Sequence, residues 1–528
     1  MPHRPPPCVR TPWPKPRGAL ALMVLAVLCG CGALPPLDGR VESRAFADTA
    51  ATRLGRATEL AAQGHGGLTG VLALAEGREA FATRMLLAEA AERSLDVQYY
   101  IWHADLTGKF LLEALRQAAD RGVRVRLLLD DNSTQGLDPI LAALDSHPNI
   151  EVRLFNPFLQ RDWRWLGYLT DFGRLNRRMH NKSFTVDNQV TVVGGRNIGD
   201  EYFDAGQEVS FVDLDVLAVG AVVPQVSADF DRYWASASAY PVASLLPAAD
   251  PRALDRLAHA AAQLRSDPAA RPYITALGRS AFVRRLIAGE LALEWTGVRL
   301  VSDDPAKGLG TAKAHSLLPQ RLAEVLGRPD QELLLVSPYF VPSASGTDAL
   351  TDLSKRGVAV SVLTNSLAAT DVPAVHAGYA KRRRALLEGG VKLFELKPDR
   401  GEAARSRRSD RGLAGSSGAS LHAKTFAVDR RRAFVGSFNL DPRSAALNTE
   451  SGLVIESPTL AANIADAFEH HLAGQSYALR LDGEGDIEWQ EQISPSAPPR
   501  LHHTEPQASI WKRAMVKLLS WLPIEWLL

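Results

Sequence analysis

Short runs of hydrophobic residues recur along most of the chain, and stretches with helical amphipathic spacing separate them. Residues 95–102 (LDVQYYIW) and 333–340 (LLLVSPYF) each have the composition of a buried strand that follows a helix. Residues 121–129 (RGVRVRLLL) and 356–364 (RGVAVSVLT) each open with Arg-Gly, a common helix ending, and continue as the alternating apolar residues of a strand. This alternation of strand and helix predicts an α/β layered fold.

The same patterns occur twice in the same order, which indicates an internal duplication. Gly122 of the first pattern recurs as Gly357, and Pro157, which ends IEVRLFNP, recurs as Pro398, which ends VKLFELKP. Two such units are expected to pack as a pseudo-dimer within one chain.

Proline content and polarity divide the rest of the chain. Residues 241–295 carry several prolines and short Ala/Leu/Arg patterns that indicate a helical connector, and residues 482–508 are polar and Pro-rich, as in a loop or surface arm. The division that we expect is a signal peptide at 1–31, an N-terminal linker at 32–70, a first domain at 71–240, the helical connector at 241–295, a second domain at 296–480, and the polar arm with an amphipathic C-terminal tail at 481–528.

The composition of the chain excludes several classes of protein. The 528 residues exceed one ordinary domain, and 46% hydrophobic with 23% charged residues is typical of a globular protein rather than a disordered or multi-span one. The formal net charge is only +1, whereas a dedicated nucleic-acid binder usually has a clear basic excess. No nucleic-acid partner is therefore expected.

The N-terminus has the pattern of an export signal. A basic head precedes the apolar run GALALMVLAVL at 18–28, and the three cysteines of the chain, Cys8, Cys29 and Cys31, all lie near this run. The sequence Leu28-Cys29-Gly30-Cys31 resembles the lipobox of bacterial lipoproteins, which implies lipidation at Cys31 and a membrane-anchored protein of the bacterial cell envelope that faces the periplasm. A plain signal peptide or an uncleaved anchor remains the alternative.

One motif appears in both copies. The first copy reads HNKSFTVD from His180 to Asp187 and is followed by GGRN, and the second reads HAKTFAVD from His422 to Asp429 and is followed by GSFN. Each histidine lies two positions before a lysine, so both side chains point to the same face of a strand. Two facing copies would gather two imidazoles, two ammonium groups and two amides, which suits phosphoryl transfer without a metal.

The double HxKxxxxD motif with its downstream G-[GS]-x-N resembles the phospholipase D superfamily. The segments LDVQYYIWHAD, LNRRMHNKSF, GGRNIGDEYF and VGSFNLDPRS are similar to the bacterial cardiolipin synthase C-like branch. The resemblance covers about residues 70 to 480. It implies two tandem phospholipase D-like α/β/α sandwich domains that form an intramolecular pseudo-dimer with one shared active site.

The resemblance also implies roles for individual residues. The nucleophile and the acid/base match His180 and His422, with His180 assigned as nucleophile by analogy with bacterial phospholipases D. The phosphate-binding groups match Lys182, Lys424, Asn197 and Asn439, with a possible hydroxyl from Ser437. The motif aspartates Asp187 and Asp429 are expected to be structural, and neither a cofactor nor a metal is expected.

A carboxylate is expected behind each histidine to fix its tautomer. Alignment of VDLDVLAVG with NTESGLVIES sets Asp213 against Glu450. Asp215 and Glu208 are the competing candidates in the first copy.

The function expected from these features is a phosphatidyltransferase that makes cardiolipin from two phospholipids through a phosphatidyl-histidine intermediate. The alternatives are a phospholipase D-type hydrolase that releases phosphatidic acid, a metal-independent nuclease of the same superfamily, and a lipoprotein that retains the fold without activity. The expected partners are membrane phospholipids with anionic headgroups, and the sequence indicates no protein partner.

Weaker features surround the motifs. Trp163, Trp165 and Tyr168 could touch lipid or simply pack, and His376 is a candidate substrate contact. Residues 509–528 have the pattern of a helix that either lies on a membrane or docks on the protein's own core, with an interruption at Pro523. Arginines precede both motifs and form either a basic rim or a solvated loop: Arg161, Arg164, Arg174, Arg177 and Arg178, then Arg405, Arg407, Arg408 and Arg411.

Overall fold

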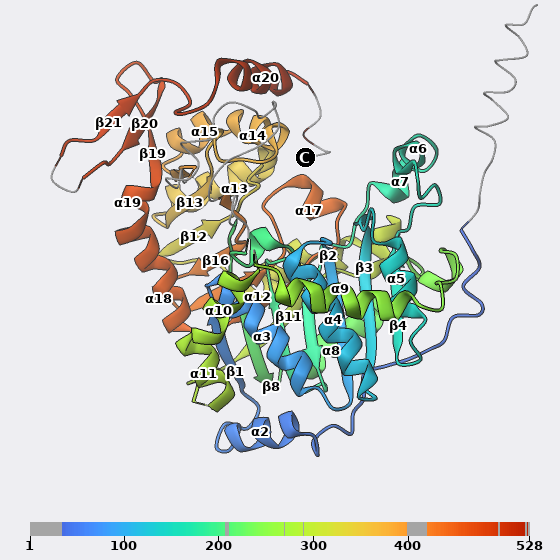
Figure 1. The fold of residues 1–528 in the computed structure, drawn as a ribbon. Helices are drawn as coiled ribbons and strands as arrows, with labels where there is room; N and C mark the ends of the chain where they lie inside the picture. The colour runs from blue at the N-terminus through green and yellow to red at the C-terminus, as the bar shows by residue number, and fades with distance from the viewer. Residues whose placement is uncertain are drawn as a thin grey trace, which may run out of the picture.

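The computed structural model describes residues 34–205, 211–268, 270–288, 290–398, 420–494, 497–522 and 525. Several predicted features lie outside the described residues: the expected signal peptide with Cys31, the candidate carboxylate Glu208, the four arginines before the second motif and Pro523. Two large β-sheets with helices on their faces form the body of the molecule, the first at the lower right and the second at the upper left of Figure 1.

The first sheet has nine strands in the order β10-β1-β8-β6-β5-β2-β3-β4-β9. Strands β2, β3 and β4 are parallel, and the neighbouring pairs β2–β5, β5–β6 and β6–β8 are antiparallel. The bounds are β1 Thr69–Leu74, β2 Ser94–Ile101, β3 Arg124–Ser133, β4 Ile150–Phe155, β5 Ser183–Val186, β6 Val190–Gly194, β8 Asp215–Gly220, β9 Ala239–Pro241 and β10 Glu294–Thr296.

The second sheet has ten strands in the order β11-β18-β17-β16-β12-β13-β14-β19-β20-β21. The bounds are β11 Val298–Ser302, β12 Glu332–Val336, β13 Ala359–Asn365, β14 Lys392–Leu396, β16 Thr425–Val428, β17 Arg432–Gly436, β18 Ser451–Ile455, β19 Ser476–Leu481, β20 Ile487–Glu491 and β21 Arg500–His502. Two short strands, β7 Phe211–Val212 and β15 Ser420–Leu421, pair with each other outside both sheets.

The two sheets repeat one topology. The order β1-β8-β6-β5-β2-β3-β4 of the first is matched position by position by β11-β18-β17-β16-β12-β13-β14 of the second. Strands β5 and β16, which follow the two HxK segments, occupy equivalent central places. The predicted α/β fold with two tandem repeats is therefore confirmed.

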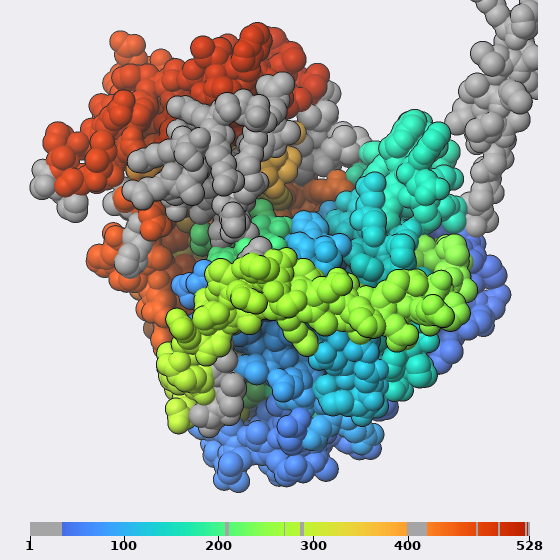
Figure 2. All heavy atoms as spheres, viewed as in Figure 1, coloured from blue at the N-terminus to red at the C-terminus, as the bar shows by residue number. Residues whose placement is uncertain are grey.

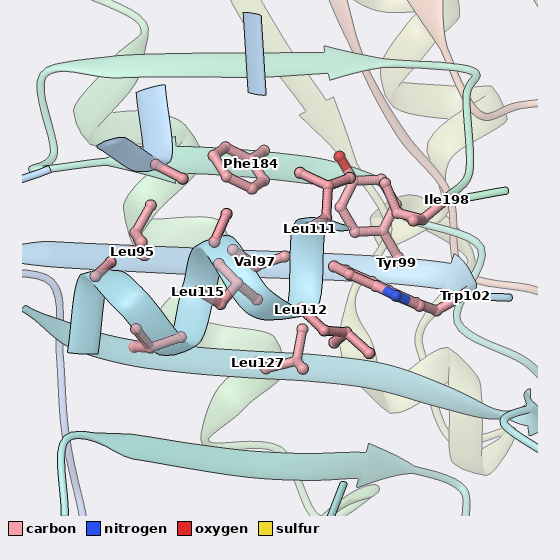
Figure 3. Close-up of a cluster of buried hydrophobic side chains, with 14 of the residues drawn as sticks. Leu95, Val97, Tyr99, Trp102, Leu111, Leu112, Leu115, Leu127, Phe184 and Ile198 are labelled. Atoms are coloured by element: carbon pink, nitrogen blue, oxygen red, sulfur yellow. The ribbon is translucent and has the colours of Figure 1, made fainter. Parts of the chain in front are cut away.

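Helices cover both faces of each sheet. In the first repeat, α4 lays Leu111, Leu112 and Leu115 over Leu95 and Val97 of β2, and these side chains form part of a large buried core (Figure 3). The helices of the first repeat are α3 Gly77–Ala90, α4 Leu106–Asp120, α5 Asp138–Asp145, α6 Arg164–Thr170, α7 Phe172–Leu175 and α8 Val223–Trp234. Those of the second are α12 Leu318–Leu326, α13 Ser343–Lys355, α14 Pro373–Ala380, α15 Arg383–Glu388, α17 Pro442–Ala446, α18 Pro458–Asp466 and α19 Leu472–Gln475.

The repeats share an apolar core. Val193 of β6 and Val216 of β8 belong to the same buried cluster as Val435 of β17 and Leu453 of β18. Burial of such surface is the main driving force for association. The two repeats therefore pack face to face as one unit.

Segments outside the repeats add helices to the first repeat and strands to the second sheet. Residues 253–288 form helices α9 Ala253–Ser266, α10 Arg271–Arg279 and α11 Ala281–Ala288, which lie across the first repeat (Figures 1 and 2). Tyr273 of α10 packs on Phe81 with ring centroids 5.8 Å apart. The arm that we expected to be a loop contributes β20 and β21, since Ile487 and Trp489 alternate with polar residues and pack on the second core.

Helix α2, Arg53–Ala61, lies at the end of the molecule opposite the C-terminal helix α20, Ile510–Ser520 (Figure 1). Among the residues that the structure describes, no helix is both long and apolar enough to cross a membrane.

Candidate active site

A backbone bridge between the repeats holds His180. The segment before β5 runs beside the segment before β18, where Met179 and Thr449 form an isolated parallel bridge. The His180 N–H donates to the carbonyl of Thr449 at 2.9 Å, and the Thr449 N–H donates to the carbonyl of Arg178 at 2.9 Å. Glu450 is the next residue, so this bridge sets the carboxylate of the second repeat beside the histidine of the first.

His422 is held in the same way from the other side. Strand β15 pairs in parallel with β7, and the N–H groups of His422 and Ala423 both donate to the carbonyl of Val212, at 2.9 and 3.0 Å. Asp213 follows Val212 in the chain. Each histidine is therefore anchored by main chain of the opposite repeat.

The two His–carboxylate pairs are crossed between the repeats. His180 Nδ1 lies 2.8 Å from Glu450 Oε2, and His422 Nδ1 lies 2.5 Å from Asp213 Oδ2. The competing candidate Asp215 instead accepts from Arg84 at 2.8 Å in the core of the first repeat. The alignment therefore selected the two carboxylates that contact the histidines, although it did not indicate that they cross over.

Hydrogen bonding fixes the tautomer of His180. Its Nδ1 also lies 3.1 Å from the carbonyl oxygen of Ser437, which can only accept. The proton of the neutral ring is therefore on Nδ1, and Nε2 is left with a free lone pair. The ionised carboxylate of Asp213 imposes the same tautomer on His422.

The two lysines lie beside the histidines of their own motifs. Lys182 Nζ donates to the carbonyl of His180 at 2.6 Å, and Lys424 Nζ lies 3.0 Å from Nδ1 and 3.2 Å from Nε2 of His422. Burial, with the charge of Lys424 as a further cause, lowers the pKa of Lys182 to about 7. Burial lowers the pKa of Lys424 to about 8. An anion between them would restore the full charge of both groups.

Burial and the neighbouring ammonium groups also lower the pKa of each histidine, that of His180 well below its usual range and that of His422 to about 4. Both rings are therefore neutral at pH 7. Burial raises the pKa of Glu450 to about 7. Although burial raises that of Asp213, His422 and Lys424 hold its pKa well below the usual range.

The remaining candidates of the G-[GS]-x-N segments are also buried at the site. Asn197 donates to the Tyr202 hydroxyl at 3.0 Å and accepts from the Ile101 N–H at 3.2 Å. The Asn439 side-chain oxygen has no hydrogen-bond partner within the described residues. Ser437 donates its hydroxyl to Glu450 Oε2 at 2.5 Å, so it contacts the carboxylate behind His180.

The motif aspartates lie at the turns after β5 and β16. Asp187 accepts from the N–H groups of Glu92, Arg93 and Ser94, and Asp429 accepts from those of Asp330, Gln331 and Glu332. Both aspartates have positive φ, 50° and 52°. Each side chain ties its turn to the start of a neighbouring strand.

Three tyrosines complete the surroundings and were missed by the sequence analysis. Tyr100 meets the ring of His180 edge-on at 4.9 Å between centroids, and Tyr202 meets His422 edge-on at 5.1 Å. Tyr339 donates to Asp371 at 2.7 Å. The only available signal was position, because Tyr100 and Tyr339 stand in the equivalent LDVQYYIW and LLLVSPYF segments.

The arginines before the first motif, for which a basic rim and a solvated loop were the two alternatives, are instead engaged with protein partners. Arg178 is buried and pairs with Asp130 at 2.9 Å, Arg161 pairs with Asp131, and Arg174 pairs with Asp171 at 2.6 Å. Arg164 and Arg177 donate to main-chain carbonyls. These side chains brace the loop because each one has a protein partner.

The weaker candidates around the motifs include both exposed side chains and side chains that contact other residues of the protein. Trp163 and Trp165 are 63% and 62% exposed, whereas Tyr168 donates to Asn132 at 2.9 Å. His376 is buried beside Arg383 and Glu505, so it serves packing.

Of the two alternatives for the tail, the structure shows the docked one. The C-terminal helix α20 docks on α14 through Val516, which packs with Leu367 and Ala377. Its outer face remains apolar and exposed, at Ile510, Trp511, Met515, Leu518, Trp521 and Leu522.

Comparisons with known proteins agree with this geometry. The family model described as "Cardiolipin synthase, PLD-like domain" matches residues 85–234 and 322–472. Cardiolipin synthase C of Escherichia coli K12 is 53% identical over 464 residues, which cover 88% of this chain and 97% of that protein. A cardiolipin synthase of Staphylococcus aureus Mu50 is 24% identical over 411 residues, covering 76% of this chain and 67% of that protein.

Among solved structures, phosphatidylserine synthase of Haemophilus influenzae Rd KW20 is similar with a TM-score of 0.51 and 15% sequence identity. The match covers 80% of this chain and 91% of that chain, and it shows a shared fold.

Proposed function

Since this chain belongs to the phospholipase D-like family of cardiolipin synthases, we propose that it transfers a phosphatidyl group from one phospholipid to a hydroxyl of a second, yielding cardiolipin. The phospholipid substrate rests on the 53% identity with cardiolipin synthase C, which spans nearly the whole of that protein. The chemistry rests on one observation, the crossed His–carboxylate pairs.

His180 is the nucleophile in this proposal. Its neutral ring carries the proton on Nδ1, so the lone pair of Nε2 attacks phosphorus and the bond to the leaving alcohol breaks. His422 takes up a proton on Nε2 when the anionic phosphodiester binds, because the ionised Asp213 and the phosphate stabilise the imidazolium, and this proton passes to the departing oxygen. The product of this half-reaction is a phosphatidyl-histidine at His180.

The second half-reaction reverses the roles of proton donor and acceptor. His422 removes the proton of the incoming glycerol hydroxyl, which attacks phosphorus and releases His180. Lys182 and Lys424 stabilise the non-bridging oxygens throughout, with Asn197 and Asn439 as further candidates, because charge accumulates there in the transition state. Water in place of the hydroxyl would give phosphatidic acid.

The substrate approaches from a membrane surface in this proposal. Cys31 carries the lipid anchor in the bacterial envelope, and the exposed tryptophans of α6 and α20 contact the bilayer. This contact with the bilayer is supported by the position of α6 and α20. Both project at the same end of the molecule (Figures 1 and 2), where both expose apolar side chains. Tryptophan favours the interface between headgroups and hydrocarbon.

The test is incubation of the purified protein with labelled phosphatidylglycerol, with and without phosphatidylethanolamine, followed by product identification. Cardiolipin is the expected product, and activity should persist in EDTA because no step is assigned to a metal. His180→Ala and His422→Ala should each abolish turnover with an unchanged melting temperature. Phosphatidic acid alone would support the hydrolase, and DNA cleavage in a parallel assay would support the nuclease.

A further inference from the structure

An apolar groove of about 610 Å³ lies on one face of the second sheet. Its floor is formed by Leu333 and Leu335 of β12 with Phe426 and Val428 of β16. The alternate residues Leu334 and Ala427 point to the other face and pack on α18. The groove is therefore on the face of the sheet that α18 leaves free.

Helices α12 and α13 form the walls of the groove. The small residues Ala323 of α12 and Gly346 and Ala349 of α13 are among those that line it. In the first repeat the equivalent helices α3 and α4 pack directly on each other, and α3 has 14 residues where α12 has 9. The shorter α12 leaves in the second repeat a space that the first repeat fills.

One end of the groove adjoins the catalytic cluster. Phe438 and Leu440 line the groove, and between them in the chain stands Asn439, one of the candidate phosphate-binding residues. Phe340 also lines the groove and forms a bridge with Leu440.

A second segment connects the groove to the site in the same way. Tyr339, the residue before Phe340, donates to Asp371, and its pKa is raised by burial and by Asp371, with Tyr100 and Tyr202 as smaller causes. Those two rings contact His180 and His422. The groove is therefore lined by direct chain neighbours of Asn439 and Tyr339, two residues that belong to the surroundings of the catalytic cluster.

We propose that this groove binds an acyl chain of the phospholipid substrate, an inference that rests on the proposed function. The lining is almost entirely hydrocarbon, and the volume is within the range of about 300–1,000 Å³ that small-molecule sites occupy. An extended peptide laid there would leave backbone N–H and C=O groups without partners, whereas a methylene chain has none to satisfy. The acyl chain would fix the distance of the phosphodiester from the two histidines.

The first test fills the groove with the variants Gly346→Leu and Ala349→Phe. A Cβ at Gly346 would meet only Pro342 Cβ at 3.4 Å and Ser343 Oγ at 3.7 Å, so the helix accepts a side chain there. The matched control is Ala344→Phe, an exposed residue of α13 outside the groove. Turnover is measured on phosphatidylglycerol with hexadecanoyl chains, on its dihexanoyl analogue and on bis(p-nitrophenyl) phosphate.

The filled variants should lose about tenfold or more in kcat/KM on the long-chain lipid. They should keep the parent's kcat/KM on the two short substrates, as should the control on all three. Equal turnover of the long-chain lipid by the filled variants and the parent overturns the inference. Failure of the parent itself to make cardiolipin would instead contradict the proposed function.

The second test locates the chain directly. A phosphatidylglycerol with a diazirine at the end of one hexadecanoyl chain is photolysed with the protein, and labelled peptides are identified by mass spectrometry. Label on residues 319–329, 343–350 or 438–446 is expected, and it should disappear in Ala349→Phe. Label found only on α6 and α20 would mean that the chain stays in the bilayer, which overturns the inference.

Discussion

His180 and His422 differ at the residue scale in the acid that stands behind them. Asp213 remains ionised because its pKa is held well below the usual range by His422 and Lys424, whereas burial raises the pKa of Glu450 to about 7. An ionised partner stabilises an imidazolium, so His422 is the ring better suited to gain and lose a proton. Glu450 carries less negative charge and stabilises an imidazolium at His180 less, so the ring of His180 stays neutral and can act as the nucleophile.

The two carboxylates should therefore respond differently to neutral substitutes. Asp213→Asn should lower kcat by about 10²–10⁴-fold, because a neutral amide no longer stabilises protonated His422. Glu450→Gln should lower kcat by only about tenfold, since the raised pKa of Glu450 already reduces its negative charge at neutral pH. Steady-state kinetics on bis(p-nitrophenyl) phosphate measure both, and equal losses in the two variants would contradict this asymmetry.

The lowered pKa values of Lys182 and Lys424, about 7 and about 8, give a second prediction. As pH rises through this range the site loses the positive charge that binds phosphate, so kcat/KM should fall between about pH 7 and 9.

Stability should not follow the same curve. The unfolded chain keeps both lysines protonated up to about pH 10.4, so in this window it binds more protons than the folded protein, and these groups favour folding as pH rises. A pH profile of kcat/KM is compared with melting temperatures in the same buffers. A kcat/KM that stays flat to about pH 9 would exclude the lysines as the titrating groups.

Strands were predictable from the sequence where the alternation of apolar residues was clear within a single segment. Strands β3 and β13 follow Arg-Gly helix endings and alternate cleanly, and β5 and β16 form within the two motif segments, although they begin only after the HxK residues. Strands β20 and β21 were missed because polar residues and prolines dominate their segment, although Ile487 and Trp489 alternate toward the core.

The candidate residues of the site were also indicated by spacing, but their crossed arrangement was not. It depends on two short bridges, Met179 with Thr449 and Leu421 with Val212, that join positions more than two hundred residues apart. A pattern within one strand contains no information about such a pairing.

The turns after β5 and β16 give a prediction at the same scale. Asp187→Ala would leave the main-chain N–H groups of residues 92–94 without their acceptor, and the free energy of unfolding should fall by about 3 kcal/mol. Asp429→Ala should cost less, about 1–2 kcal/mol, because Asp429 is only half-buried and water can replace it. Urea unfolding of each variant measures the difference, and a larger loss for Asp429→Ala would contradict the burial argument.

At the scale of the whole molecule, exposed apolar residues gather at one end. Trp163, Trp165, Leu169 and Phe172 of the α6–α7 segment are 44–68% exposed, and Trp511 and Trp521 at α20 are 77% and 73% exposed. Both groups project at the same end in Figures 1 and 2, away from α2. Two separate contacts with one bilayer would hold the protein in a fixed orientation.

Replacement of these tryptophans should weaken membrane binding without unfolding the protein. In a chain that begins at residue 34, Trp163→Ser with Trp165→Ser, or Trp511→Ser with Trp521→Ser, should each lower the vesicle-bound fraction by at least about threefold. Flotation with phosphatidylglycerol-containing liposomes measures this fraction. The control is Leu60→Ser on α2, an apolar residue that is 67% exposed at the opposite end. A similar loss in the control would mean that general surface hydrophobicity, and not this end, drives binding.

The crossed pairs also determine at which stage of synthesis and folding the catalytic site can form. Synthesis produces the first repeat before the second, and a chain halted between them carries His180 without Glu450 and Asp213 without His422. Such a fragment holds half of each pair and completes neither. The catalytic site therefore forms only when the last part of the fold has packed on the first, and the chain gains its chemistry at that point.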